Sequence, residues 1–466
     1  MLNPDRGSER RSLTVKSAAF HTLGCKVNIY ETEAMRQALI REGYEIRSFE
    51  EAADVYVINT CSVTNIADRK SRQMLHRARA MNPDAVVVAA GCYAQAAAEQ
   101  LKQDQGVDII LGNREKTKIA EILEQWFREK EESGKHQMLL AGDMKEAFCY
   151  EDLSADTMDS HTRAFLKIQD GCNQFCTYCI IPYLRGRIRS RNAEDILREA
   201  EAFAGKGYRE LVLTGIHLSS YGKDLENMEI RGDAPVKDLG DVIRLLDRVT
   251  GIERVRVGSL EPRLITEPFL RTLSDLEHFC PHFHLSLQSG SDSVLKRMNR
   301  RYTAEEYYRS VCLLREYFPN AAVTTDIITG FPGETEEEFE ETLRFAEKTG
   351  FYEIHIFPYS ARKGTRAASM PGQLPRAVKA ERAATLQALT KEQSRAFRAE
   401  RIGTQAEILT EEEIVIGGVP YMVGSTREYV RCAAPAGMGA NRLVSGTAAG
   451  FLTEDILLLE SCGKES

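Results

Sequence analysis

Short apolar runs alternate with helix-like stretches along most of this 466-residue chain. Apolar β-branched runs separated by helices are typical of parallel sheets that are covered on both faces. The sequence therefore predicts a small doubly wound α/β domain over residues 16–132. The expected strands of this domain are residues 18–23, 54–59, 85–90 and 108–111. The expected helices are residues 30–41, 67–81, 95–102 and a last one that ends near residue 128.

The same alternation returns after a charged segment at about residues 129–161, which we expect to be a mobile connector. Helices are expected between the new strands, for example over 193–206 and 304–317. Six such units predict an open sheet or an incomplete barrel, a partial (β/α)6 arrangement whose site lies at the C-terminal ends of the strands. The six expected strands are residues 165–168, 210–213, 254–258, 282–287, 323–328 and 353–357.

The C-terminal part has a different pattern. Residues 376 to about 401 predict one basic helix. After Gly403 come short strand-like runs with glycine-rich turns, namely AEIL, IVIG, EYVRCA, RLVSG and DILLLE. Such a pattern predicts a small β-barrel of about 60 residues. Together with the length of the chain, these shifts predict three domains, over residues 16–132, 158–390 and 391–462.

Eleven cysteines raise the question of whether they bind metal or fill cores. The first residues are polar and lack the apolar stretch of a signal peptide, and no apolar run approaches the roughly 18 residues of a membrane span. We therefore expect a cytoplasmic protein with no membrane contact, in which thiols stay reduced. Cys149, Cys280, Cys312, Cys432 and Cys462 show no ligand spacing and are assigned no function.

The strongest local motif is a C-x3-C-x2-C triplet formed by Cys172, Cys176 and Cys179, just after the expected strand 165–168. Three neighbouring thiolates can ligate three irons of a [4Fe–4S] cluster and leave the fourth iron open. The alternative is a zinc site. Structural zinc normally takes four ligands, and no fourth Cys or His is near in the sequence. The triplet therefore favours an iron–sulfur cluster.

A second set of cysteines is dispersed along the chain. Cys25, Cys61 and Cys92 end the runs HTLGC, VINTC and AAGC. Because the C-terminal ends of parallel strands meet at one edge of a sheet, the three thiols are expected to converge. This predicts a second [4Fe–4S] cluster. The alternative is three small buried core residues, since free cysteine is often buried. Isolated histidines, among them His21, His217 and His355, are interpreted as structural or loop residues.

Several longer motifs resemble the radical S-adenosylmethionine methylthiotransferase family, across nearly the whole chain. They are TLGCKVNIYETE, INTCSVTNIADRKSRQ, GCYAQ, KIQDGCNQFCTYCIIPYLRGRIRSR, LSLQSGSDSVLKRMNRRYT, DIITGFPGE and FPYSARKGT. Within the family, LGCKVN followed by YETE resembles the branch that acts on N6-threonylcarbamoyladenosine at position 37 of tRNA. The alternatives are a methylthiotransferase for isopentenyl-adenosine in tRNA or for a ribosomal-protein aspartate.

The resemblance implies two [4Fe–4S] clusters, S-adenosylmethionine as cofactor, and a C-terminal RNA-binding β-barrel called TRAM. The catalytic cluster would be held by Cys172, Cys176 and Cys179, and the auxiliary cluster by the three dispersed cysteines. The implied reaction transfers a methylthio group to C2 of the adenine. The implied partners are the anticodon stem-loop of tRNA and an electron donor such as flavodoxin or ferredoxin. An alternative hypothesis, from a different functional class, is a non-catalytic iron–sulfur protein that binds RNA.

Polar or glycine residues near strand ends are candidate contacts for the cofactor. Each has an alternative reading as ordinary strand-to-helix turn chemistry, as when Glu334 simply begins a helix. Glycine at such a place permits close backbone approach. The candidates are Tyr178, Thr214, Gly215, Ser259, Glu261, Gln288 with the neighbouring Ser289, and Gly330.

The net charge of −8 argues against a nucleic-acid partner, but residues 362–401 hold ten Lys or Arg and only three Glu. Such a segment can contact phosphates; alternatively, it is a solvated helix face. The candidate RNA contacts are Arg376, Lys379, Arg382, Lys391, Arg395 and Arg398. A second basic patch beside the triplet is expected to contact RNA or a cofactor carboxylate; it consists of Arg185, Arg187, Arg189 and Arg191.

Overall fold

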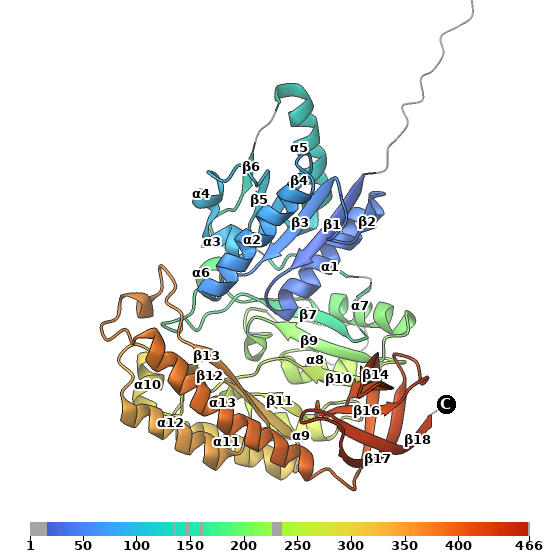
Figure 1. Ribbon diagram of the computed structural model, residues 1–466, viewed down its shortest axis with the longest axis vertical. Helices are drawn as coiled ribbons and strands as arrows, with labels where there is room; N and C mark the ends of the chain where they lie inside the picture. The colour runs from blue at the N-terminus through green and yellow to red at the C-terminus, as the bar shows by residue number, and fades with distance from the viewer. Residues whose placement is uncertain are drawn as a thin grey trace, which may run out of the picture.

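The computed structural model describes residues 16–134, 137–144, 149–155, 157–158, 162–225 and 235–464. In Figure 1 the chain forms an N-terminal sheet domain at the top, a larger strand-and-helix unit below it, and a ring of strands at the lower right. The order of these parts along the chain is the one that the sequence predicts.

Six parallel strands form the N-terminal sheet, in the order β2-β1-β3-β4-β5-β6. The four expected strands are present. The two edge strands were not predicted, because β2 (EIR) has no apolar run and β6 (MLL) lies in the segment expected to be a charged connector. One of them, β6, pairs with β5 inside the segment expected to be a connector, so that expectation is wrong for this part. The strands are β1 (Ser17–Thr22), β2 (Glu45–Arg47), β3 (Val55–Thr60), β4 (Val86–Gly91), β5 (Ile109–Leu111) and β6 (Met138–Leu140).

Helices cover both faces of this sheet, as a doubly wound fold requires. Alternate residues of β3 point to opposite sides: Tyr56 packs in one core with Leu75 of α2, and Val57 packs in the other with Trp126 of α5. The expected helix 95–102 is instead two short helices, the first of which begins at Cys92. The helices are α1 (Lys26–Arg41), α2 (Asn65–Met81), α3 (Cys92–Ala96), α4 (Ala98–Leu101), η1 (Lys116–Lys118) and α5 (Ile119–Ser133).

All six strands expected in the central unit are present, together with a short antiparallel strand, β8, that was not predicted. They pair as two sheets, β10-β9-β7-β8 and β11-β12-β13. Parallel bridges from Val255 to Phe279 and from Leu260 to Leu285 connect the two sheets. In the described part of the chain β13 does not pair with β7, so the arrangement is an incomplete barrel. The strands are β7 (Ala164–Asp170), β8 (Arg189–Ser190), β9 (Glu210–Gly215), β10 (Arg254–Val257), β11 (His282–His284), β12 (Ala322–Thr329) and β13 (Glu353–Pro358).

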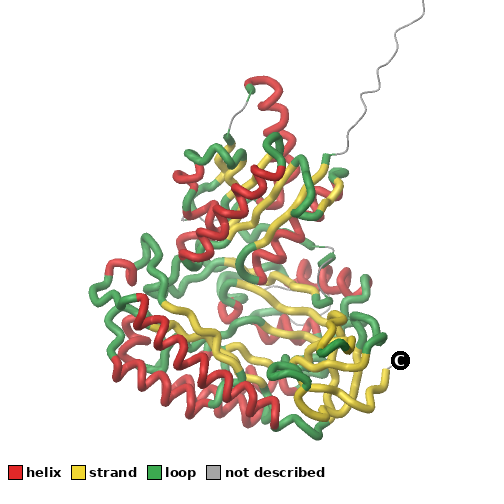
Figure 2. The backbone as a smooth tube through the Cα atoms, in the orientation of Figure 1, coloured by secondary structure: helices red, strands yellow, loops and turns green. Residues whose placement is uncertain are grey.

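Helices lie along the outside of this incomplete barrel (Figure 2). Its core also takes in Tyr30 of α1, which packs with Phe165 of β7 and Phe203 of α7. Helix α1 therefore joins the N-terminal sheet to the barrel. The helices of the central unit are α6 (Ile181–Arg185), α7 (Ala193–Gly205), η2 (Leu218–Ser220), α8 (Leu239–Leu246), η3 (Pro262–Leu264), α9 (Glu267–Ser274), α10 (Asp292–Arg297), α11 (Ala304–Tyr317), α12 (Glu336–Thr349) and η4 (Arg366–Ser369).

The predicted basic helix is α13 (Arg376–Ala399), which packs beside β13. It continues across residue 390, where the sequence placed a domain boundary, and the next strand begins at Gln405. Five strands then pair in a closed ring, β14-β15-β16-β18-β17. The runs AEIL and IVIG belong to one long strand with an irregularity at Thr410 and Glu412, and β15 was missed. The strands are β14 (Gln405–Ile416), β15 (Val419–Ser425), β16 (Arg431–Pro435), β17 (Leu443–Phe451) and β18 (Leu457–Lys464).

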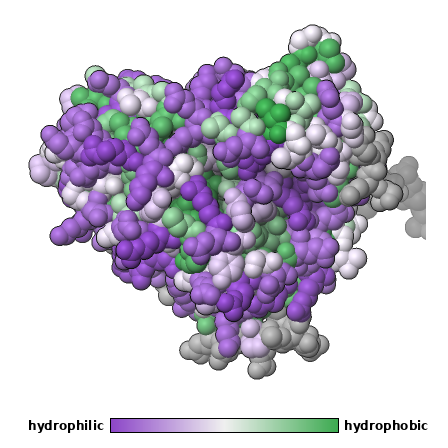
Figure 3. Space-filling view, turned by 90° about the horizontal axis from the view of Figure 1, so that it is seen from below, coloured by the Kyte–Doolittle hydropathy of each residue, from purple (hydrophilic) through white to green (hydrophobic). Residues whose placement is uncertain are grey.

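The ring is fixed to the barrel by two arginines of β10. Arg254 donates hydrogen bonds to the carbonyl oxygens of Ser425 (2.7 Å) and Glu407 (2.9 Å), and Arg256 donates to the carbonyl oxygen of Arg427 (2.8 Å). The face seen from below in Figure 3 is mainly hydrophilic, with its hydrophobic residues in separate patches. Among the described helices, none is long and apolar enough to cross a membrane.

Candidate active site

The local cysteine triplet lies in a tight loop after β7. Gly171 begins the loop with a φ of +69°, and a Cβ there would lie 1.8 Å from the carbonyl oxygen of Arg187, so only glycine fits. The backbone amide of Cys172 donates to Gly186 (3.1 Å), and that of Cys179 donates to Cys176 (3.0 Å). The loop therefore presents all three thiols at the C-terminal end of a barrel strand.

The thiols of this triplet are shielded from water and supported by nearby donors. Burial raises the pKa of Cys172 to about 11 and that of Cys179 to about 12, and the neighbouring thiols add to both shifts. The guanidinium of Arg300 donates to Sγ of Cys176 (3.3 Å), and the amide of Gln174 donates to Sγ of Cys172 (3.4 Å). Such donors stabilise thiolates that ligate metal.

The dispersed cysteines meet at one edge of the N-terminal sheet. Cys25 caps α1, Cys61 follows β3 and Cys92 begins α3 directly after β4. A Cβ on Gly24 would lie 2.9 Å from Cβ of Cys61, so the chain beside Cys25 packs closely on Cys61. Burial raises the pKa of Cys61 to about 11, and both Cys92 and Cys25 contribute to that shift. The predicted convergence is present in the structure.

The spacing of the thiols does not match a single zinc ion in either triplet. Around one tetrahedral zinc, a Zn–S distance of about 2.3 Å places the sulfur atoms only about 3.8 Å apart. Among the described residues, neither triplet has all of its sulfur atoms within 4.8 Å of one another.

Side chains around the local triplet connect its loop to the barrel. Glu261 accepts a hydrogen bond from Nε2 of Gln174 (3.0 Å) and lies within ion-pair distance of Arg300 (3.2 Å) and His217 (3.3 Å). Burial alone would raise the pKa of Glu261, but His217 and Arg300 outweigh it and lower the pKa. Sequence reasoning found Glu261 and missed the other three. The missed signal was the RMNRRYT motif, which was read only as part of the resemblance.

The other cofactor candidates differ in their surroundings. Gln288, with a φ of +77°, lines a cavity together with Tyr178. Thr214 is buried at the end of β9, next to Gly215, and Ser259 is exposed. Gly330 does not face open space, because a Cβ there would lie 2.4 Å from Cγ of Lys379. The group that closely approaches Gly330 is therefore the side chain of Lys379 on α13.

A cavity of about 300 Å³ lies between the two triplets. The loop after Cys61 contributes Val63 and Thr64 to its wall, and the local triplet contributes Cys179. The rest of the wall comes from Tyr178, Ile180, Ile181, Gln288, Asp326, Ile328, Phe357, Pro358, Tyr359 and Ser360. Apolar and aromatic side chains thus surround a few polar groups, as in most sites for organic ligands.

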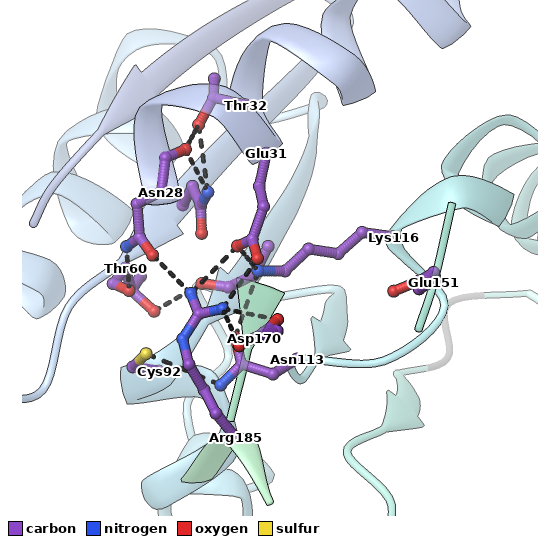
Figure 4. A network of polar contacts seen from close by, with 12 residues as sticks. Asn28, Glu31, Thr32, Thr60, Cys92, Asn113, Lys116, Glu151, Asp170 and Arg185 are labelled. Carbon is purple, nitrogen blue, oxygen red and sulfur yellow. Dashed lines mark hydrogen bonds and ion pairs between the residues drawn. The ribbon is translucent and has the colours of Figure 1, made fainter. Parts of the chain in front are cut away.

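A buried ion network joins the N-terminal sheet domain to the barrel (Figure 4). Arg185 binds Glu31 of α1 (2.8 Å) and Asp170 of β7 (3.2 Å). Lys167 bridges the same two carboxylates at 2.7 Å each, and Lys116 pairs with Glu31. Burial alone would raise the pKa of Glu31, but the charges of Arg185, Lys116 and Lys167 hold it well below its usual range.

Amide contacts extend this network to the dispersed triplet. Asn113 donates through Nδ2 to Sγ of Cys92 (3.6 Å) and to the carbonyl oxygen of Leu184 (3.0 Å), as Figure 4 shows in part. Arg185 also donates to Oδ1 of Asn28 (2.8 Å). Nδ2 of Asn28 in turn donates to the carbonyl oxygen of Thr60 (3.0 Å). One set of contacts therefore supports the loops of both triplets.

The expected second basic patch is wrong for three of its four arginines. Arg185 is 0% exposed and serves the network just described. Arg189 is buried next to Asp170, and Arg191 pairs with Glu199 and Asp152. Arg187 is exposed and lies over the ring of Phe175. Arg185, Arg189 and Arg191 therefore bind protein carboxylates instead of RNA or cofactor.

The candidate RNA contacts of α13 also separate into two groups. Arg382 is 5% exposed and pairs with Glu334 and Glu336, and Arg398 is 6% exposed and pairs with Asp455. Both hold the helix in place, so their assignment to RNA is wrong. Lys379 is half-buried and binds the carbonyl oxygen of Tyr359. The side chains that face solvent are Arg376, Lys391 and Arg395.

Comparison with known proteins agrees with this geometry. Residues 166–346 match the family model "Radical SAM superfamily", and residues 17–112 match "Uncharacterized protein family UPF0004". The chain is 43% identical over 397 residues to "Threonylcarbamoyladenosine tRNA methylthiotransferase MtaB" of Bacillus subtilis (strain 168), which covers 85% of each chain. The chain belongs to the radical SAM methylthiotransferase family. The predicted resemblance is thus confirmed.

The other relatives of this methylthiotransferase carry two different names. It is 39% identical to the protein of the same name from Aquifex aeolicus, over 85% of this chain and 93% of the relative. It is 36% identical to "tRNA-2-methylthio-N(6)-dimethylallyladenosine synthase" of Moorella thermoacetica, over 84% and 86%. The solved radical S-adenosylmethionine methyltransferase TsrM from Kitasatospora setae shares the fold, with a TM-score of 0.55 and 15% identity over 76% of this chain and 77% of that one.

Removing one thiol from each triplet tests the two-cluster site. After anaerobic reconstitution we expect about eight iron atoms per wild-type chain and about four in Cys61→Ala or in Cys176→Ala, the result expected when each triplet binds its own four-iron cluster. The double variant should hold almost none. Iron and sulfide analysis measures this, with Cys312→Ala as the matched control. A wild-type content of four would disprove the two-cluster site.

Neutralising Glu31 tests the buried network. Glu31→Gln leaves three buried cations short of a partner, so we expect the free energy of unfolding to fall by about 3–5 kcal/mol at pH 7. Because the pKa of Glu31 is lowered by folding, its contribution is present above about pH 4.3 and is lost as acid protonates the folded state. The difference between wild type and variant should therefore shrink in acid.

Denaturant unfolding measures this difference, and Glu132→Gln on the exposed surface of α5 is the matched control. If Glu31→Gln is no less stable than that control, the network does not stabilise the contact between the two units.

Proposed function

We propose that this protein transfers a methylthio group to C2 of N6-threonylcarbamoyladenosine at position 37 of tRNA. It uses S-adenosylmethionine and two [4Fe–4S] clusters, one held by Cys172, Cys176 and Cys179 and the other by Cys25, Cys61 and Cys92. The observation that carries this proposal is the cavity of about 300 Å³ whose wall takes residues from the loops of both triplets. A substrate there lies between the two cluster sites.

The target carbon explains why such a site is needed. C2 of adenine is an unactivated aromatic carbon that no side-chain base can deprotonate usefully. The cofactors supply radical chemistry and the methylthio group, while the protein supplies binding, orientation and exclusion of water. Glu261, Gln174 and Arg300 hold the loop of the local triplet in place. Phe357 and Tyr178 provide aromatic surface in the cavity for a flat base.

The substrate branch is supported by the ranking of the relatives. Four matches at 35–43% identity are named for threonylcarbamoyladenosine and include the two highest, whereas the matches named for dimethylallyladenosine are 35–37% identical. The gap is small, so a methylthiotransferase for the dimethylallyl nucleoside is the second candidate. A purely RNA-binding protein would have no use for two converging cysteine triplets.

The C-terminal ring is proposed to be a TRAM domain that binds the anticodon stem-loop. Supporting this, Arg376, Lys391 and Arg395 present positive charge along α13 directly before the ring. An electron donor such as flavodoxin or ferredoxin and a cytoplasmic location belong to the same proposal.

Nucleoside mass spectrometry of tRNA from a deletion strain tests the reaction and its branch. We expect the methylthio form of threonylcarbamoyladenosine to disappear almost completely and its unthiolated precursor to accumulate. Wild-type protein should restore it, and Cys176→Ala should not. Loss of the methylthio dimethylallyl nucleoside instead would reassign the protein to the second branch.

Salt-dependent binding tests the RNA surface. Each lysine or arginine that contacts a phosphate contributes roughly 0.7–0.9 to the slope of log K against log salt. Replacing Arg376, Lys391 and Arg395 together by Ala should therefore reduce that slope for tRNA by about two to three. The matched control replaces Lys102, Lys118 and Lys130 of the N-terminal domain. An equal slope in the two triple variants would exclude α13 as the contact surface.

A further inference from the structure

Three side chains on neighbouring barrel strands form a polar cluster that the radical chemistry does not use. They are His284 of β11, Asp326 of β12 and His355 of β13. Nε2 of His284 lies 3.2 Å from Oδ2 of Asp326, and Nδ1 of His355 lies 3.4 Å from Oδ1 of the same carboxylate. The two imidazole rings stack at 5.3 Å between centroids. The sequence had placed His355 among structural residues.

One member of this cluster, Asp326, reaches the cavity described above. Asp326 is part of the cavity wall, together with Tyr178 and Phe357. His355 is 46% exposed, so one face of its ring is free to meet a ligand. The hydrogen bond that His355 donates to Asp326 raises the pKa of His355. Glu353 is the other carboxylate beside His355, at 3.8 Å from Nε2.

A lysine from the other domain acts electrostatically on the same histidine. Lys26 directly follows Cys25 and lies within electrostatic range of His355, His282 and Tyr429. In the described part of the chain, Lys26 has no hydrogen bond or ion pair with another residue. Helix α1 therefore brings an unpaired cation to the barrel from the domain that carries the dispersed triplet.

The two candidate substrates differ most in the group that would meet these side chains. A threonylcarbamoyl group carries a carboxylate, a hydroxyl and ureido N–H groups. A dimethylallyl group is wholly apolar and would offer no polar group to the charge of Lys26 or to the exposed part of the His355 ring. Buried polar groups left unpaired disfavour a ligand strongly, which makes such a pocket selective.

We propose that Lys26 and His355 bind the carboxylate of the substrate's N6-threonylcarbamoyl group, with Asp326 as the positioning residue for His355. The inference rests on the proposed function, and it names the side chains that set the substrate branch.

The test compares wild type, Lys26→Met and His355→Leu on two anticodon stem-loop RNAs. One carries threonylcarbamoyladenosine and the other its methyl ester, which removes the negative charge. In wild type, esterification should raise KM about tenfold or more, because a charge-assisted pair is lost. In each variant the acid substrate should already show that higher KM, and esterification should change it little, since paired groups are not additive. Asp326→Asn should raise KM for the acid substrate alone.

Iron content and RNA-independent formation of 5′-deoxyadenosine are measured in parallel. In each variant these two readouts show whether a higher KM comes from lost substrate recognition or from a lost cluster. His76→Leu on exposed α2 is the matched control and should equal wild type in both. Lys26→Arg should restore part of the lost affinity. If esterification affects wild type and variants alike, the inference is wrong. If wild type modifies neither RNA, the proposed function fails instead.

His284, Asp326 and His355 are also residue types that bind metal ions, and metal analysis of the same variants tests that alternative. A stoichiometric metal other than cluster iron in wild type, lost in His355→Leu, would overturn the assignment to the carboxylate.

Discussion

The buried ion network around Glu31 is the constraint on which the site depends. Two carboxylates and the cations of Arg185, Lys116 and Lys167 share a volume from which water is excluded. Buried ion pairs of this kind add little net stability compared with apolar packing, but they are costly to separate. They therefore fix which surfaces of the two units meet. The triplets lie on opposite sides of this junction, so the network sets the separation between them.

A second set of contacts holds the same junction from the cavity side. Arg362, after β13, binds Asp68 (2.6 Å), Asn65 (2.8 Å) and Ser62 (2.8 Å), and Ser62 directly follows Cys61. Both junctions join the loop of a cysteine to an arginine of the other unit. The planar guanidinium, with five donors, suits such shared contacts better than lysine would.

Much of the architecture follows from the sequence, because strand and helix periods are local. All ten expected strands of the two α/β units exist, and the topology rule for parallel sheets correctly gathers Cys25, Cys61 and Cys92. Strands β2 and β6 were not predicted because β2 has no apolar run and β6 is one short apolar run inside a charged segment. The errors at Arg185, Arg382 and Arg398 share one cause. A run of arginines has the same composition whether its charges face solvent or carboxylates such as Glu31 and Glu334, which are distant in sequence.

The two cysteine sets differ in how much of the chain separates their members. Cys172, Cys176 and Cys179 lie within eight consecutive residues, so an unfolded or nascent chain already holds them close together, and iron can bind there before the barrel forms. Cys25 and Cys92 are held together only once β1, β3 and β4 have paired. Bringing the dispersed cysteines together therefore costs more loop-closure entropy than the local triplet, and the folded sheet has to supply it.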